Sequence, residues 1–176
     1  PVKAIPAALL LALLAGFTPL SANDSAPVVS GGLTADEAYN KARQLFSEKE
    51  FAGALDLYLG FIADYGEAEQ AREAVRNSRY PIAICMIQLG RYADAVDAIG
   101  TALALEPPLP KDQIKDLTFW LAIANLQENQ YAAARAELEK FLDMFPPQAE
   151  NNPLYARRDP AALRIPEARA LIGTSY

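Results

Sequence analysis

The stretch Phe51-Ala-Gly-Ala-Leu-Asp-Leu-Tyr58 decides the fold, because close variants of it occur twice more, at Tyr92-Ala-Asp-Ala-Val-Asp-Ala-Ile99 and Tyr131-Ala-Ala-Ala-Arg-Ala-Glu-Leu138. In each copy an aromatic residue is followed three positions later by alanine and four positions after that by a large apolar residue. The three aromatic residues lie 41 and 39 positions apart. A repeat of this length indicates stacked units that cannot bury their apolar faces alone. The sequence therefore predicts an all-α array of helical hairpins.

Three repeats, each a pair of helices, account for residues 34–66, 67–107 and 111–147. In each repeat, apolar side chains recur at three- and four-residue spacing on both sides of a short polar turn, which is typical of two amphipathic helices packed together. The predicted helices cover about residues 35–48, 51–65, 67–89, 93–106, 112–128 and 131–145.

Local signals mark the ends of several helices. Thr34 and Glu37 have the spacing of a capping box, in which the hydroxyl of the first and the carboxylate of the second each accept a backbone N–H. Gly66 suits a left-handed residue at the end of the second helix. Pro81 has no amide hydrogen, so a kink or a break is expected just before it.

The spacing of small residues is the most specific feature of the repeats. Alanine stands at matching positions in all three first helices and in all three second helices, where it would let two helix backbones approach closely. These residues are Ala42, Ala83 and Ala122 in the first helices and Ala54, Ala95 and Ala134 in the second. Together with the aromatic residues and with Pro107 and Pro146 at the repeat ends, this pattern resembles the tetratricopeptide repeat over residues 34–147.

The resemblance implies a right-handed α-solenoid of about three repeats. The residues that depart from the family's usual choices are Lys41, Phe61, Asn125 and Phe141. Residues 148–165 are expected to form a loop, and residues 166–176 the first helix of a truncated fourth repeat, with Gly173 at the small position. Because a solenoid normally ends on a polar capping helix, we expect the chain to be part of a longer array.

Residues 1–22 have the layout of a secretory signal peptide. A positive start is followed by the apolar run Ile5–Leu14 and by small residues that end at Ala22. Cleavage after Ala22 would leave residues 23–33 as a linker before the first repeat. The alternative is an uncleaved membrane anchor, although the run is short for a hydrocarbon core of about 30 Å.

The composition argues against catalysis, metal binding and nucleic-acid binding. The chain contains no histidine, which removes the usual general base and most zinc sites. Its net charge of −6 comes without the clustered Lys and Arg that bind phosphates. The carboxylate pairs Asp94/Asp97 and Glu137/Glu139 are expected on solvated faces, and Cys85 as a small buried apolar residue. We therefore predict that the protein is not an enzyme and takes no cofactor.

In the tetratricopeptide family, the first helices of the repeats line a concave groove that binds partner proteins. The corresponding residues of this chain are Tyr39, Asn40, Arg43, Tyr80, Ile84, Phe119, Trp120, Ile123 and Gln127, and we predict that they contact a partner. One shared position is aromatic in all three repeats, and aromatic side chains are favoured as interface anchors. The alternative for Phe119 and Trp120 is packing against the neighbouring repeat.

These features predict a non-enzymatic, exported scaffold or adaptor that binds a protein or peptide segment. The spacing near 40 residues and the ending Phe141–Phe145 resemble envelope members of the family, which implies a bacterial periplasm, envelope proteins as partners, and an assembly or transport system. Contact with a membrane is expected only through those partners. The alternative is an accessory repeat region of a larger cell-wall or polysaccharide-processing enzyme, which sequence beyond Tyr176 would distinguish.

Overall fold

The computed structural model describes residues 32–150 and 152–174, and all regular secondary structure in these residues is helical. In chain order the elements are α2 (Ala35–Ser47), α3 (Phe51–Tyr65), the 3-10 helix η1 (Glu69–Ala71), α4 (Arg72–Gln88), α5 (Tyr92–Leu103), α6 (Lys111–Gln127), α7 (Tyr131–Asp143), α8 (Pro153–Arg158), the 3-10 helix η2 (Pro160–Arg164) and α9 (Ile165–Thr174). The predicted signal peptide, most of the predicted linker and Tyr176 lie outside the described residues.

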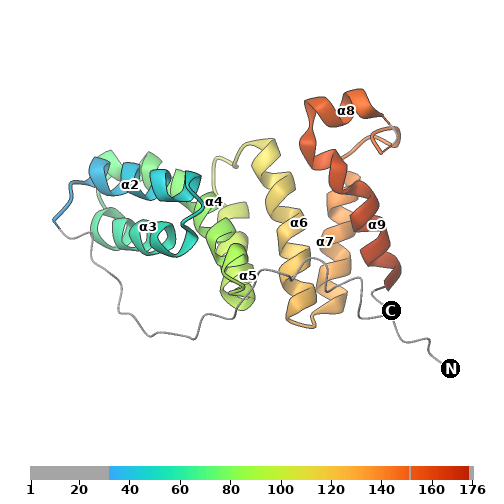
Figure 1. The fold of residues 1–176 in the computed structure, drawn as a ribbon, viewed down its shortest axis with the longest axis horizontal. Coiled ribbons are helices and arrows are strands. Elements are labelled where there is room, and N and C mark those ends of the chain that lie inside the picture. Colours follow the sequence, from blue (N-terminus) through green and yellow to red (C-terminus); the bar gives the residue numbers. More distant parts are fainter. Residues whose placement is uncertain (1–31, 151, 175–176) are drawn as a thin grey trace.

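The helices pack in chain order. Helix α2 packs on α3, α4 on α5 and α6 on α7, and each pair also packs on the next through α3 and α4 and through α5 and α6. The first helices of neighbouring pairs meet as well, because α2 contacts α4 and α4 contacts α6. Figure 1 shows that the pairs change direction along the chain: α2 and α3 run across the picture, whereas α6 and α7 run from top to bottom.

The turn inside each pair has the same backbone structure. Lys49, Gly90 and Asn129 have φ values of 64°, 71° and 59°, in the left-handed region. The N–H of the following residue then bonds to a carbonyl in the last turn of the first helix, with N···O distances of 2.9, 2.9 and 2.7 Å in the three turns. This is the Schellman type of helix ending. The three turns are 41 and 39 residues apart, so the backbone repeats with the period of the sequence pattern.

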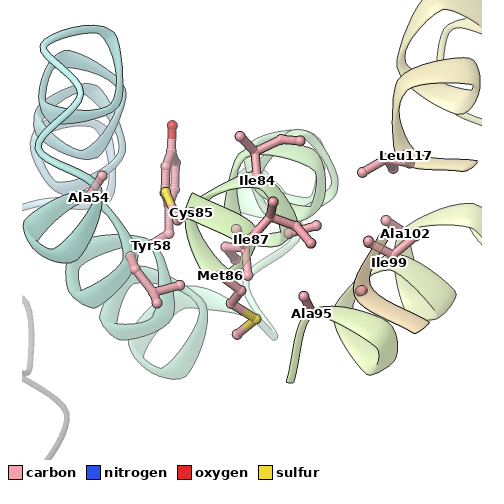
Figure 2. Close-up of a cluster of buried hydrophobic side chains, with 14 of the residues drawn as sticks. Ala54, Tyr58, Ile84, Cys85, Met86, Ile87, Ala95, Ile99, Ala102 and Leu117 are labelled. Atoms are coloured by element: carbon pink, nitrogen blue, oxygen red, sulfur yellow. The ribbon is translucent and has the colours of Figure 1, made fainter. Parts of the chain in front are cut away.

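The small residues singled out in the sequence are in the core. Ala42, Ala54, Ala83, Ala95, Ala122 and Ala134 are all 0% exposed. Figure 2 shows the main cluster, in which Ala54 and Tyr58 of α3 lie on one side of Cys85 and Ile87, and Ile99 of α5 lies on the other. Helix α4 is thus covered on both sides, as expected for the middle of a stack.

The start of α2 and the extent of α3 confirm the sequence predictions. Thr34 Oγ1 accepts the Glu37 N–H at 3.4 Å, and the Glu37 carboxylate accepts the Thr34 N–H at 2.8 Å. The backbone bond is the main cause that lowers the pKa of Glu37 below its ordinary value. Helix α3 covers residues Phe51–Tyr65, as predicted.

Three local predictions were wrong in whole or in part. Gly66 is right-handed, with φ −58° and ψ −30°, and glycine is needed there because a Cβ would lie 2.4 Å from the Ile62 carbonyl oxygen. Of the kink or break expected just before Pro81, the break does not form, since α4 continues through this residue. Residues 81–87 are all buried, and this packing offsets the lost backbone hydrogen bond. Helix α4 also starts later than predicted, at Arg72, because η1 occupies the preceding residues.

The predicted loop at residues 148–165 contains α8 and η2. Asn152 caps α8, because its side-chain oxygen accepts the N–H groups of Leu154 and Tyr155 at 3.0 and 3.3 Å, and Pro153 fits the first helical position. The polar and proline residues that predict a loop here therefore form a helix cap instead. Helix α9 packs on α7 through Ile165 and Ala168, which are 3% and 0% exposed.

Candidate functional site

An open groove of about 850 Å³ runs between α2, α4 and the start of α6. Its walls carry both charged and aromatic side chains. The residues that matter for the argument are Asp36, Tyr39 and Arg43 from α2, Glu73, Arg76, Asn77 and Tyr80 from α4, and Gln113 from α6. The groove follows from the packing order, since α2, α4 and α6 are the first helices of the three pairs and lie side by side.

Three of the nine predicted partner-binding residues line this groove: Tyr39, Arg43 and Tyr80. Asn40 is exposed on α2 but is not among the lining residues, and Gln127 is exposed at the end of α6. The structure therefore brings predicted residues of the first and second helix pairs together in one groove. The predicted residues of the third pair do not line it.

The remaining predicted residues are wholly or partly buried. Ile84 is 9% exposed in the main core, and Phe119 is 2% exposed in a second core formed by α6, α7 and the C-terminal elements. Trp120 and Ile123 are half-buried against the same second core. For Phe119 the structure thus favours core packing, the alternative left open by the sequence.

The floor of the groove near α2 is aromatic. The ring centroid of Tyr39 lies 6.3 Å from that of Tyr58 and 5.6 Å from that of Phe61. Tyr58 is 1% exposed, and burial raises its pKa well above the ordinary value, so its hydroxyl stays neutral at any physiological pH. The guanidinium of Arg43 lies 5.8 Å from the Tyr39 ring centroid, which places a cation beside the aromatic surface.

Arg76 fixes the edge of the groove near α6, a role that the sequence did not reveal. Its guanidinium donates to the carbonyl oxygens of Pro107 and Pro108, both at 2.8 Å. The connection between α5 and α6 is thereby tied to α4 across 31 and 32 residues of sequence. Two acidic residues, Asp36 and Glu73, and two basic residues, Arg43 and Arg76, line the groove, so it has no dominant sign of charge.

A second polar cluster adjoins the groove through Tyr80. The Tyr80 hydroxyl donates to one carboxylate oxygen of Asp116 at 2.8 Å, and Arg164 of η2 pairs with the other oxygen. Burial is the main cause that raises the pKa of Tyr80, and the Asp116 carboxylate adds to it. Beside this cluster, Lys115 pairs with Asp159, and its ammonium lies 4.5 Å from the Phe145 ring centroid. Residues 159–164 therefore cover one face of α6.

The carboxylate pairs considered for acid–base chemistry are structural or solvated. Asp94 is exposed and pairs with Arg91 at 2.8 Å, whereas Glu137 and Glu139 pair separately with Lys140 and Arg135. In residues 32–150 and 152–174, no three His, Cys, Asp or Glu side chains come close enough together to hold a metal ion.

Comparisons of this chain with protein-family models, with curated proteins and with solved structures give no match. None of the helices in the described part of the chain has both the length and the apolar character needed to cross a membrane.

Proposed function

We propose that the chain is a tetratricopeptide-like, right-handed α-solenoid that acts as a non-enzymatic scaffold and binds a protein segment in the groove between α2, α4 and α6. The solenoid arrangement is supported by three like helix pairs that pack in chain order and share one turn structure. It is further supported by complete burial of the six alanines at the small positions of the repeats. The resemblance thus gains physical support at the positions that define it.

The observation that carries the binding proposal is the open groove itself. The groove contains half-buried aromatic side chains, Tyr39 and Tyr80, next to charged groups that remain accessible, such as Arg43 and Glu73. Aromatic anchors surrounded by polar groups are the usual composition of a protein-binding surface. The lack of a dominant charge favours a segment with mixed side chains over a uniformly charged one.

Export to a bacterial periplasm, with envelope proteins as partners, is part of the same proposal. Its support is the signal-like composition of residues 1–22 and the resemblance to envelope members of the family. Mass measurement of the protein purified from its own cells tests it. A mature chain that begins at Asn23 is expected, and a chain that retains Ile5–Leu14 in the membrane fraction would contradict export with cleavage.

Site-specific photo-cross-linking in the native host tests the groove. A photoreactive phenylalanine analogue at Asn77, which is exposed and lines the groove, is expected to cross-link one discrete partner. The same analogue at Ala93, exposed at the start of α5, is the matched control and is expected to give no such product.

Arg43→Ala then checks the product for specificity. Arg43 is exposed and needed for no core contact, so its removal is expected to weaken the Asn77 cross-link while the helical content stays unchanged. A product that forms equally from Ala93, or that persists with Arg43→Ala and with Tyr39→Ala, would place the binding surface elsewhere.

A further inference from the structure

The side chain of Arg164 contacts a carboxylate and two aromatic rings of α6, a set of groups that suits the binding of a guanidinium. Its guanidinium pairs with Asp116, and its central carbon lies 4.9 Å from the Phe119 ring centroid and 5.1 Å from that of Trp120. The side chain of Asp116 is only 18% exposed. A flat, weakly hydrated cation fits between a carboxylate and two aromatic rings, whereas a compact ammonium group would use them less well.

The groups that hold Arg164 also contact one another or the core. The Tyr80 hydroxyl of α4 donates to the second oxygen of Asp116 and so orients the carboxylate. Phe119 and Trp120 are held edge to face, with ring centroids 5.8 Å apart, and Phe119 also packs on Phe141 at 5.3 Å. We call Asp116, Tyr80, Phe119 and Trp120 the arginine seat. It belongs entirely to α4 and α6, the helices that also form the groove.

The segment that supplies Arg164 is partly exposed. It is a 3-10 helix of five residues, and its Leu163 is 70% exposed. The preceding helix α8 packs mainly on η2 itself, and Figure 1 shows it at the outer end of the molecule. The segment is anchored by Ala162, which is 3% exposed in the second core, and by the Arg164–Asp116 and Lys115–Asp159 pairs.

We propose that the seat is an arginine-recognition site of the groove, which Arg164 occupies within the chain and which an arginine from a bound protein segment occupies after displacing it. The proposal rests on the proposed function, because Tyr80 belongs to both the groove and the seat. A tethered group acts at an effective concentration of about a millimolar. Arg164 therefore keeps weakly binding ligands in solution from occupying the seat. Only a segment that also gains contacts in the groove competes well, and the seat thus adds selectivity.

The test uses an emptied seat and a defined peptide. The probe is a peptide of residues 159–167, Asp-Pro-Ala-Ala-Leu-Arg-Ile-Pro-Glu, which contains a single arginine. It is added at up to millimolar concentration to the wild-type chain and to Arg164→Ala, and Trp120, the only tryptophan, reports binding by fluorescence. We expect the peptide to bind Arg164→Ala at least about tenfold more tightly than the wild type, because the tethered competitor is gone.

Controls separate the seat from general peptide binding. A peptide with Arg164→Ala is expected not to bind, free L-arginine to bind more weakly than the peptide, and the double variant Arg164→Ala/Asp116→Asn to bind neither. Equal affinity of the peptide for the wild type and Arg164→Ala, or no binding to folded Arg164→Ala, would overturn the proposal. Binding of L-arginine as tight as that of the peptide would also overturn it, because the site would then recognise the free amino acid.

An independent measurement uses Asp116→Asn in the full chain. Loss of the carboxylate charge is expected to release Arg164 from the rings and to increase quenching of Trp120 by acrylamide. Arg169→Ala, which removes an exposed ion pair with Glu150, is the matched control and is expected to leave quenching unchanged. Unchanged quenching in Asp116→Asn would overturn the proposal even if Arg164→Ala did not fold. Neither assay depends on cross-linking from Asn77. The proposed function and the proposed arginine site are therefore tested by separate experiments, and one can be disproved without the other.

Discussion

The face formed by the first helices of the pairs differs between the two halves of the molecule, being open over α2 and α4 and covered over α6. At the shared aromatic position of the repeats, Tyr39 and Tyr80 are half-buried and line the groove, whereas Phe119 is 2% exposed. The helices that carry these residues have the same place in their pairs. The repeat position therefore does not by itself decide whether a side chain is available to a partner.

The connections between the pairs account for the difference. Residues 66–71 and 104–110 lead directly from one pair to the next and stay at the ends of the helices, whereas residues 144–164 contain α8 and η2 and return across α6. The Lys115–Asp159 and Asp116–Arg164 pairs fasten this long connection. The long connection thus covers on α6 the face that the short connections leave open on α2 and α4.

The largest effect is expected from Phe119→Ala, because Phe119 packs on Phe141 and under Arg164. Loss of a buried aromatic side chain should lower the free energy of unfolding by about 3–5 kcal/mol, measured by chemical denaturation. Tyr131→Ala is the matched control: Tyr131 is 52% exposed, and its removal should cost less than about 1 kcal/mol. Similar small losses in both variants would mean that α6 is as open as α2.

The next largest effect is expected at the close helix–helix contacts that occur in both halves of the molecule. Ala95→Leu and Ala134→Leu should each lower the free energy of unfolding by about 1–3 kcal/mol, because both alanines are 0% exposed and no space is left for a larger side chain. Asp94→Ala, at an exposed site next to Ala95, should change it by less than about 0.5 kcal/mol. If Ala95→Leu and Asp94→Ala had equal effects in denaturation, the helix register would be incorrect.

The turns provide a finer comparison, because one backbone shape is built from three different residues. Gly90→Ala should cost about 1–2 kcal/mol, since a Cβ is disfavoured at φ 71°. Lys49→Gly should be neutral or stabilising by up to about 1 kcal/mol, because relief at φ 64° offsets the greater freedom of the unfolded chain. Denaturation midpoints of the two variants measure this, and a loss of stability with Lys49→Gly would show that the turns are not equivalent.

The smallest effect is expected at the exposed start of α2. Thr34→Ala should cost about 1 kcal/mol, because the Glu37 N–H in the first turn of α2 loses its side-chain acceptor. The folded-state pKa of Glu37 is lowered, so its stabilising contribution is complete above the unfolded-state pKa and is lost as pH falls through the folded-state value. Glu37→Gln should therefore reduce the drop in stability between neutral and acid pH, measured by denaturation at each pH, and an unchanged drop would exclude this role.

The sequence predicted those parts of the fold that depend on neighbours in the chain. The Thr34–Glu37 cap, the extent of α3 and the burial of Ala95 and Ala134 follow from spacing within one or two helical turns, where sequence pattern and geometry are directly linked. Of the predicted partner-binding residues, Tyr39, Arg43 and Tyr80 of the first helices line the groove, to which α3 also contributes Tyr58.

What the sequence did not predict depends on residues far apart in the chain. Phe119 is buried against Phe141 of α7 and against the C-terminal elements, including Arg164, which is 45 positions away, and no local pattern encodes the return of that segment. The role of Arg76 rests on carbonyl oxygens more than 30 positions away. Gly66 was assigned a common glycine geometry, whereas it is needed for close approach to the Ile62 carbonyl.

Hydroxyl-radical footprinting of the full chain tests the central claim most directly, because it measures the accessibility of each aromatic side chain in solution. An array of like helix pairs that is open over α2 and α4 and covered over α6 predicts clear oxidation of Tyr39, Tyr80 and exposed Tyr131, with Phe119 and Phe141 protected. Oxidation of Phe119 at the rate of Tyr131, or protection of Tyr39 equal to that of Phe141, would contradict the account.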